Sequence, residues 1–249
     1  MQKHVFDFLG RRIELWTHAE PDLLARAIRG HRTFYEIDVL MKCREIHLPG
    51  TTILDIGANI GNHAVFFAAI LDARVHAFEP FPPNQELLEL NVAANSLEDR
   101  VTIHRCALGE QVTTGATSLG LPNNFGTVRV SVGAGDVPVH TIDSLRLAEP
   151  VGLLKVDVEG AECTVLRGAA ALIRRWLPDM MVEAGDPDAF QAVARLLLES
   201  GYVPRGRYAW TPTYLFSAAD QQERMTRLLS RQDLSGPAMA DGPARLASP

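Results

Sequence analysis

The residues with the clearest chemical potential in this chain lie in one short segment, from Ile53 to Glu79. It reads ILDIGANIGNHAVFFAAILDARVHAFE: an apolar strand, a glycine turn led by Asp55, a helix, and a second apolar strand that ends in an acid. This order is typical of a nucleotide-binding βαβ unit. In such a unit Gly57 and Gly61 permit a tight turn and close ligand approach, and a carboxylate such as Glu79 binds ribose hydroxyls.

The spacing of the turn distinguishes between ligands. It is Asp55-x-Gly57-x-x-x-Gly61, which differs from the GxGxxG of dinucleotide sites and places an acid where an NAD fingerprint has none. An acid there can meet a cationic ligand. S-adenosylmethionine (SAM) has a ribose diol, an ammonium, a sulfonium and no phosphate, so the segment favours SAM over a dinucleotide. A strand-turn-helix with no ligand is the remaining alternative.

A second segment, LLKVDVEG, carries three charged residues at alternate positions, Lys155, Asp157 and Glu159. A strand buried on both faces is normally almost continuously apolar. Buried charges cost several kcal/mol unless they are paired, so these should lie near the strand's carboxyl end, where open α/β sheets place their ligand crevice. The alternative is a structural ion pair between Lys155 and Asp157.

Strands and helices alternate from residue 51 onward, which predicts an α/β fold with a mostly parallel sheet and helices on both faces. The expected strands are Thr52–Ile56, Arg74–Phe78, Val101–Ala107, Gly152–Val158 and Asp179–Glu183. The expected helices are Asn62–Leu71, Asn84–Asn95, Ala161–Trp176 and Pro187–Ser200.

The N-terminal part has a different pattern. His4 to Trp16 alternates on both sides of Gly10-Arg11 and predicts a hairpin, and a short helix is expected over Pro21–Arg29. Thr33 to Glu36 has the form of a capping box that opens a helix running to about His47. We therefore divide the chain into an extension (1–48), a catalytic domain (49–218) and a C-terminal part (219–249).

Other segments are less regular. Gly109–Asp136 is rich in Gly, Thr and Asn and shows no clear period, so a long functional or disordered loop is expected. Two closing strands are expected at Tyr202–Pro204 and Thr213–Ser217, followed by a helix through Leu229. The tail Ser235–Pro249 consists largely of Gly, Pro, Ala and Ser, and we expect it to be disordered.

Four motifs occur in a characteristic order: LDIGANIGNHAVFFA, FEPFPPN with Asn91 and Asn95 downstream, VPVHTIDSL and LLKVDVEGAECTVLRGA. Together they closely resemble the FkbM-type SAM-dependent methyltransferases, over about residues 34 to 217. The resemblance implies the seven-stranded, Rossmann-like sheet of class I methyltransferases. It also implies O-methylation of a hydroxyl on a natural product, sugar or glycoside.

The resemblance also assigns site residues. Those implied for the methionine part of SAM are Asp55, Gly57, Asn59, Gly61 and Asn62. Glu79, with Pro80, is implied for the ribose, and Cys106, Ala107 and Leu108 for the adenine. Asp157 and Glu159 match the family's acids near the transferred methyl group. The resemblance implies that the stretches Asn123–Gly126 and Thr211–Tyr214 face the acceptor. Our candidate residues for the acceptor side are Tyr35, Glu36, Asn124, Phe125, Glu183 and Tyr214.

Methyl transfer from a sulfonium requires mainly alignment of two reactants, which can supply roughly 7–11 kcal/mol. A hydroxyl acceptor must also lose its proton, and our order of candidate bases is Asp157, Glu159 and then His63 at a helix start. Glu183 could bind the acceptor or pair with Lys155. Asp157, Glu159 and Glu183 could offer oxygen ligands to Mg²⁺, as in catechol-type O-methyltransferases. The sequence shows no tight acidic cluster, so we assign no metal ligand from it.

Composition narrows the function further. The chain has 249 residues, 47% of them hydrophobic, and can bury a sizeable core. Its net charge of −6 gives no basic footprint for nucleic acid, and three widely spaced cysteines suggest neither disulfides nor zinc. The longest strongly apolar run, Val65–Leu71, is far short of the roughly 18 residues of a membrane span. We expect a cytoplasmic enzyme with a small-molecule acceptor, and a homo-oligomer is compatible with the sequence. A nicotinamide-dependent oxidoreductase and a catalytically silent SAM-binding protein are the alternatives.

Overall fold

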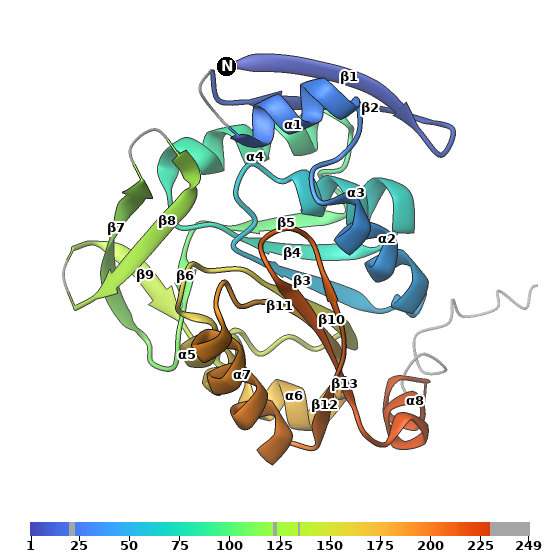
Figure 1. Ribbon diagram of the computed structural model, residues 1–249, viewed down its shortest axis with the longest axis vertical. Helices are drawn as coiled ribbons and strands as arrows, with labels where there is room; N and C mark the ends of the chain where they lie inside the picture. Colours follow the sequence, from blue (N-terminus) through green and yellow to red (C-terminus); the bar gives the residue numbers. More distant parts are fainter. Residues whose placement is uncertain (20–22, 122–123, 134, 230–249) are drawn as a thin grey trace, which may run out of the picture.

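The computed structural model describes residues 1–19, 23–121, 124–133 and 135–229. Its central sheet has seven strands: β3 (Thr52–Ile56), β4 (Arg74–Phe78), β5 (Val101–His104), β10 (Val151–Val156), β11 (Asp179–Glu183), β12 (Tyr202–Tyr208) and β13 (Thr213–Ala218). They lie in the order β12-β13-β11-β10-β3-β4-β5 (Figure 1). The five strands from β11 to β5 are parallel, and β13 runs antiparallel to both of its neighbours. The predicted seven-stranded, mostly parallel sheet is confirmed.

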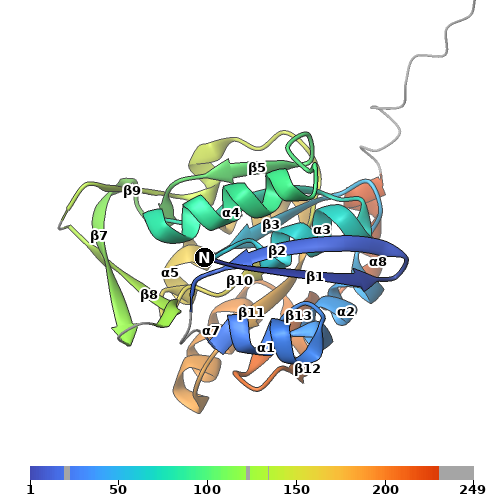
Figure 2. The same cartoon turned by 90° about the horizontal axis from the view of Figure 1, so that it is seen from above.

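Helices cover both faces of this sheet (Figure 2). On one face lie α2 (Ile37–Ile46), α3 (Asn62–Leu71) and α4 (Pro82–Ala94), and on the other α5 (Glu162–Arg167), α6 (Ala170–Trp176), α7 (Pro187–Glu199) and α8 (Gln221–Leu229). Successive strand side chains point to opposite faces. Leu153 and Met181 therefore enter the first core, whereas Leu154 and Met180 enter the second.

The N-terminal hairpin is also present, as β1 (Gln2–Phe8) and β2 (Arg11–Thr17), followed by α1 (Leu23–His31). Two amides of α4 fix it to the rest of the molecule. Asn91 accepts from the Trp16 N–H at 2.5 Å and donates to its carbonyl at 2.9 Å, and Asn95 bonds in the same way to Glu14. These two asparagines, quoted above as part of a family motif, are thus used for docking the hairpin.

The expectation of an irregular segment over Gly109–Asp136 is wrong. A long hairpin is formed by β7 (Thr113–Leu121) and β8 (Asn124–Val132). With β6 (Ala107–Leu108) and β9 (Val137–His140) they make a second sheet of four strands, in the order β6-β9-β7-β8. The expected strand Val101–Ala107 accordingly ends at His104, because the chain leaves the central sheet there and pairs with β9.

The predicted capping box is wrong as well. Helix α2 begins at Ile37, and its N-cap is Glu36 in the left-handed conformation, with φ of 53° and no side-chain capping bond. The Glu36 side chain reaches instead toward His63, with carboxylate oxygen and Nε2 3.5 Å apart. A non-glycine residue rarely adopts this conformation, so tertiary contacts must hold it there.

The single helix expected over Ala161–Trp176 is two helices, α5 and α6. Between them Gly168 lies against the chain at Gly109, where a β-carbon would come within 1.9 Å of the Gly109 carbonyl oxygen. Asp143 then caps the start of α6 by accepting from the backbone N–H groups of Ala171 and Leu172 at 2.8 and 2.9 Å. Both contacts are tertiary, and helical periodicity alone does not reveal them.

No helix among the described residues combines the length and the apolar character that a bilayer crossing needs. The expected helix through Leu229 is present as α8. The expectation for the tail Ser235–Pro249 lies outside the described residues.

Candidate functional site

The site is built where β3 and β10, which are neighbours in the sheet, both end. The glycine turn after β3 passes directly over the start of the loop after β10. A β-carbon on Gly57 would lie 1.8 Å from the Asp157 carbonyl oxygen, and the φ of Gly57 is 78°. Only glycine meets both conditions. The carboxyl ends of two adjacent parallel strands thus form one surface, as in other open α/β sheets.

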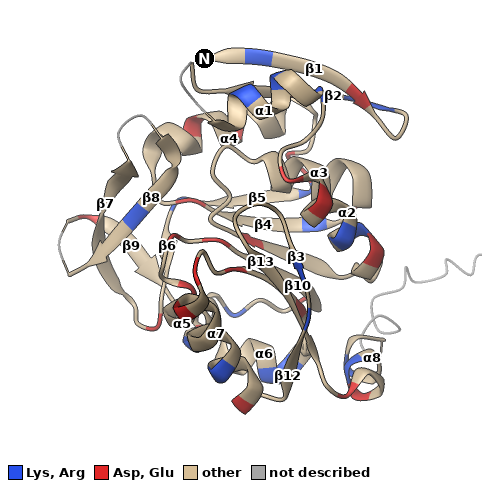
Figure 3. Cartoon of the chain, in the orientation of Figure 1, with Lys and Arg blue, Asp and Glu red and all other residues tan. Residues whose placement is uncertain are grey.

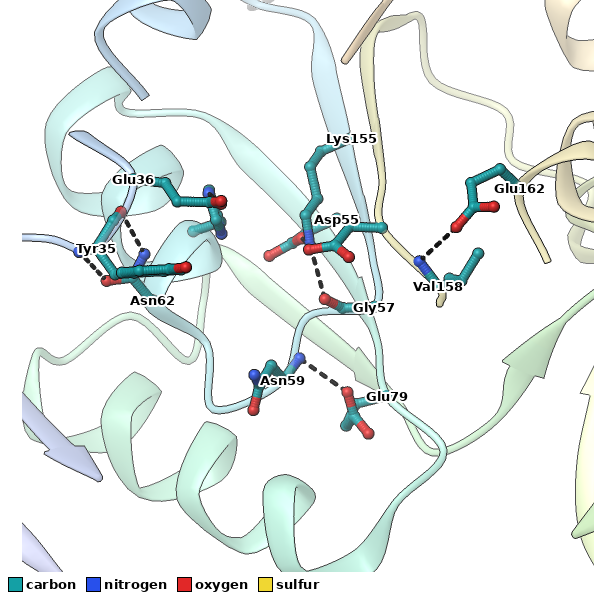
Figure 4. A network of polar contacts seen from close by, with 12 residues as sticks. Tyr35, Glu36, Asp55, Gly57, Asn59, Asn62, Glu79, Lys155, Val158 and Glu162 are labelled. Carbon is teal, nitrogen blue, oxygen red and sulfur yellow. Dashed lines mark hydrogen bonds and ion pairs between the residues drawn. The ribbon is translucent and has the colours of Figure 1, made fainter. Parts of the chain in front are cut away.

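A buried ion pair lies beneath this turn (Figure 4). The Lys155 ammonium is 3.3 Å from Asp55 and 3.4 Å from Asp157, and it donates to the Gly57 carbonyl at 2.6 Å. Asp55 is completely buried and Lys155 is 4% exposed. Burial opposes the charge on Lys155, but Asp55 and Asp157 raise its pKa above the ordinary value. Asp55 therefore lies buried beneath the turn beside Lys155, and it is not among the residues that line the pocket described below.

Glu79 follows β4 and lies on the other side of the turn. Its carboxylate accepts from the Asn59 N–H at 2.8 Å and from the Phe81 N–H at 2.9 Å. Burial raises the pKa of Glu79 to about 7, against these hydrogen bonds. The carboxylate lines the pocket described next, and its remaining lone pairs can accept hydrogen bonds from hydroxyls.

One pocket joins these elements, and several predicted residues line it. They are Gly57, Asn59, Glu79, Pro80, Cys106, Ala107, Leu108, Phe125, Asp157 and Glu159. The sequence did not identify Asn84, Val128, Val130 and Ala161, which also line it. Val128 and Val130 belong to β8, so the unexpected β7–β8 hairpin forms one wall of the pocket.

The tip of this hairpin is fastened to two other parts of the chain. The Phe125 ring stacks on His18 at a centroid distance of 3.8 Å. His18 is 2.9 Å from the Asn84 side-chain oxygen, and the Asn84 amide donates to the Phe125 carbonyl at 3.0 Å. His18, Asn84 and Phe125 form what we call the pocket latch, and it fixes the position of Phe125 in the pocket wall.

Carboxylates converge beside Asp157. Glu183, at the end of β11, hydrogen-bonds to Asp157; burial and then Asp157 raise the pKa of Glu183 to about 11. Burial favours the neutral form of Asp157 too, but Lys155 lowers its pKa below the ordinary value. Burial and then Asp157 raise the pKa of Glu159 to about 7. At neutral pH the proton of the Asp157–Glu183 pair therefore resides on Glu183.

His63 and Glu36 flank this carboxylate group. The pKa of His63 is lowered to about 3 by burial and by Lys155, so its imidazole is neutral. Its Nε2 atom is buried and has no hydrogen-bond partner among the described residues. The pKa of Glu36 is raised to about 7 by burial and then by Asp157. Neither side chain is among the residues that line the pocket.

Nine predicted site residues are not among those that line the pocket: Asp55, Glu36, His63 and Glu183, described above, and Tyr35, Gly61, Asn62, Asn124 and Tyr214. Asn62 exchanges two 3.0 Å hydrogen bonds with the backbone of Tyr35, so both residues brace the start of α3 (Figure 4). Gly61 is the N-cap of the same helix, at φ of 86°. Tyr214 packs its ring on Phe190 at 4.3 Å. The side chain of a further residue, Asn124, accepts from the Gly126 N–H within the β7–β8 turn.

A family model described as "Methyltransferase FkbM domain" matches residues 55–204, more than half of the chain. The chain belongs to the FkbM methyltransferase family. The matched region begins at Asp55 and includes the glycine turn, Glu79, the β7–β8 hairpin and the carboxylates that follow β10 and β11.

Two fungal relatives support this membership. The FkbM chain is 28% identical over 204 residues to methyltransferase sdnD of Sordaria araneosa, covering 64% of this chain and 77% of that protein. It is 29% identical over 189 residues to methyltransferase 1 of Beauveria bassiana, covering 64% and 76% of the two chains. This protein is accordingly a methyltransferase.

A crystal structure of an FkbM methyltransferase from Methylobacillus flagellatus has a similar fold, with a TM-score of 0.51 and 19% identity. The similarity covers 75% of this FkbM chain and 49% of that longer one. The fold is that of the class I SAM-dependent methyltransferases, as the resemblance of the motifs implied.

Proposed function

We propose that the chain is a SAM-dependent O-methyltransferase that acts on a hydroxyl of a small polar acceptor, such as a sugar, a glycoside or another natural product. The observation that carries this proposal is the single pocket that Gly57, Glu79 and Asp157 line together. It offers a turn for the methionine part, a carboxylate for the ribose and an acid for the acceptor, all within one cavity.

For the cofactor, the pocket provides complementary groups along its length. Glu79 can accept hydrogen bonds from two ribose hydroxyls, and the wall at Cys106–Leu108 and Phe125 can take the flat, apolar faces of adenine. The Gly57 carbonyl, held by Lys155, and the backbone at Asn59 lie where the amino-acid end would bind. Among the described residues that line the pocket there is no lysine or arginine to meet a phosphate, which supports SAM over a dinucleotide as the ligand.

For the reaction, Asp157 is our first candidate base. It stays ionised because Lys155 lowers its pKa, and it lines the pocket with a side chain that is 33% exposed. The acceptor oxygen attacks the methyl carbon, the sulfur–carbon bond breaks as the oxygen–carbon bond forms, and the hydroxyl proton passes to Asp157. Glu159 is the second candidate, and the neutral His63 is the third.

Binding is the first test. Calorimetry should show micromolar affinity for SAM and for its demethylated product S-adenosylhomocysteine (SAH), and much weaker binding of NAD. Tight NAD binding without SAM binding would end this proposal.

Turnover is the second test. Asp157→Asn should bind SAH within a few-fold of the wild type but lose about 10² to 10⁴ in kcat with glycoside and sugar acceptors and radiolabelled SAM. Asp99→Asn, an exposed change of the same kind before β5, is the matched control and should leave kcat unchanged. If Asp157→Asn keeps near-normal turnover, Asp157 is not the base, and Glu159 and His63 remain as the candidates.

A further inference from the structure

The loop that follows β10 forms part of the pocket wall. It comprises residues 157–161, between β10 and α5, and four of these five residues line the pocket: Asp157, Val158, Glu159 and Ala161. Figure 3 shows acidic positions gathered where the central strands end, beside α5. Asp157 and Glu159 of this loop are the first two candidate bases. The chemistry proposed above therefore depends on the conformation of the loop.

The sheet fixes only the beginning of this loop. The Asp157 N–H donates to the Ile56 carbonyl at 3.1 Å, and the Lys155 ammonium lies 3.4 Å from the Asp157 carboxylate. The Asp157 carbonyl also lies directly against Gly57. All of these contacts are made by Asp157. They do not determine where the Glu159 carboxylate lies, because rotatable backbone bonds lie between the two residues.

Two consecutive residues of the loop have left-handed backbone conformations. The φ of Glu159 is 54° and that of Gly160 is 101°. Glycine adopts such angles freely, but a residue with a β-carbon rarely does, so surrounding contacts must hold Glu159 in place. Left-handed and turn conformations also direct neighbouring backbone N–H groups toward one point, which creates a concavity that binds an anion. Here the anion is a side chain of the protein.

The Glu162 carboxylate occupies this concavity. One of its oxygens accepts hydrogen bonds from the Gly160 N–H at 3.0 Å and, more weakly, from the Val158 N–H at 3.4 Å (Figure 4). Neither N–H group has another hydrogen-bond partner among the described residues. Glu162 is 6% exposed, and burial raises its pKa, whereas the hydrogen bonds from the loop lower it. The loop and the buried carboxylate therefore stabilise each other.

From this geometry we infer that Glu162 is a positioning residue, which holds the loop so that the Glu159 carboxylate faces the pocket. Glu162 is not among the residues that line the pocket, so it acts through the backbone of residues 158–160. The inference rests on the proposed function, in which Glu159 takes the proton of the acceptor or positions the acceptor. Without the Glu162 carboxylate the loop can adopt other conformations, and those that turn Glu159 away from the pocket are inactive.

The test compares two substitutions of Glu162. Alanine removes the oxygen that accepts from the loop, whereas glutamine keeps one. With glycoside and sugar acceptors and radiolabelled SAM, the full-length Glu162→Ala variant should lose about 10- to 100-fold in kcat/KM, the factor that corresponds to a hydrogen bond to a charged group. Glu162→Gln should stay within a few-fold of the wild type. Glu199→Ala, an exposed change of the same kind at the end of α7, is the matched control and should leave kcat/KM unchanged.

A double variant separates positioning from a general structural role. Because Glu162 acts through Glu159, Glu162→Ala/Glu159→Gln should lose no more kcat/KM than the more impaired of the two single variants. The single variants should also divide their losses between kcat and KM in the same way. If the two losses multiply instead, or if Glu162→Ala keeps the kcat/KM of the wild type, the inference is wrong. A Glu162→Gln variant as impaired as Glu162→Ala would also overturn it.

Misfolding and failure of the proposed function give results different from these. Circular dichroism shows whether Glu162→Ala folds. If it does not, Gly160→Ala takes its place, because a β-carbon there meets nothing within 4 Å and disturbs only the left-handed backbone. That variant should show the same loss and the same dependence on Glu159. If the wild type transfers no methyl group to these acceptors, the proposed function fails. If the wild type is active and the losses multiply, only the positioning role fails.

Discussion

The Lys155–Asp55 pair gives the sharpest prediction about stability. Lys155→Met keeps most of the side-chain length but removes the ammonium that lies between Asp55 and Asp157. Asp55 is completely buried, so the variant leaves its charge without a partner in the core. Removing one partner of a buried pair typically costs about 3–5 kcal/mol of the free energy of unfolding. The hydrogen bond to the Gly57 carbonyl is lost as well.

The assay is urea unfolding at pH 7, followed by far-ultraviolet circular dichroism. Lys42→Met is the matched control, because Lys42 pairs with Glu45 at 2.8 Å on the surface and such pairs contribute about 0–1 kcal/mol. The double variant Lys155→Met/Asp55→Asn removes the unpaired charge along with the cation. It should therefore recover part of the stability that Lys155→Met loses.

Two results would refute this reasoning. If Lys155→Met lowers the free energy of unfolding by less than about 1 kcal/mol, the buried pair contributes no more to stability than a surface ion pair does. A double variant no more stable than Lys155→Met would show that the buried charge of Asp55 is not the source of the loss. Either comparison requires that the free energy of unfolding depends on urea concentration with the same slope in the wild type and in the variants.

Three further predictions concern the turn, the ribose site and the edge of the sheet. Gly57→Ala should abolish SAH binding and should lower the free energy of unfolding more than Gly201→Ala does. Gly201 is the matched control, because it has nearly the same φ of 79° but open space where a β-carbon would lie. Equal losses of stability in the two variants would argue against the clash at the turn. Glu79→Gln should weaken SAH binding by about 1.5–3 kcal/mol, measured by calorimetry at pH 8. The affinity of the wild type for SAH should fall as the pH drops below about 7, because Glu79 then gains a proton. If the SAH affinities of the wild type and of Glu79→Gln depend on pH in the same way, the role of this carboxylate is contradicted. Burial lowers the pKa of His104 to about 4, so on acidification the unfolded chain binds a proton at this residue before the folded protein does. The free energy of unfolding should therefore fall between about pH 6.5 and pH 4, and His104→Gln should make this fall smaller. If the wild type and His104→Gln lose stability equally over this pH range, His104 is not the cause.

Much of the central sheet could be predicted from the sequence because local pattern and tertiary fold agree there. The bounds of β3, α3, β4 and β11 follow directly from apolar runs, glycines and the alternation of strands and helices. Glu79 could be placed because its position after β4 is a property of the βαβ unit itself.

Other features depend on contacts between distant segments and have no local signal. The β7–β8 hairpin lacks strict alternation because nearly all of its residues are partly buried or exposed, so neither of its faces needs to be consistently apolar. The break between α5 and α6 depends on the approach of Gly168 to Gly109. The spacing of Lys155 and Asp157 correctly indicated a strand end, but only the register of β10 against β3 shows that Asp55 shares the same lysine. Alternation along β13 could not tell that Tyr214 would pack on Phe190.

The pocket latch has a consequence for protein engineering. His18 lies in the N-terminal extension, outside the region 55–204 that the family model matches, yet its ring supports Phe125 in the pocket wall. A domain boundary drawn between residues 48 and 49 therefore assigns the two rings to different parts of the chain, although they stack on each other at the pocket wall. A chimera that exchanged this extension between two family members would replace the support of Phe125 while leaving every residue of the matched region intact. Ligand preference could then diverge between enzymes whose shared cores are identical.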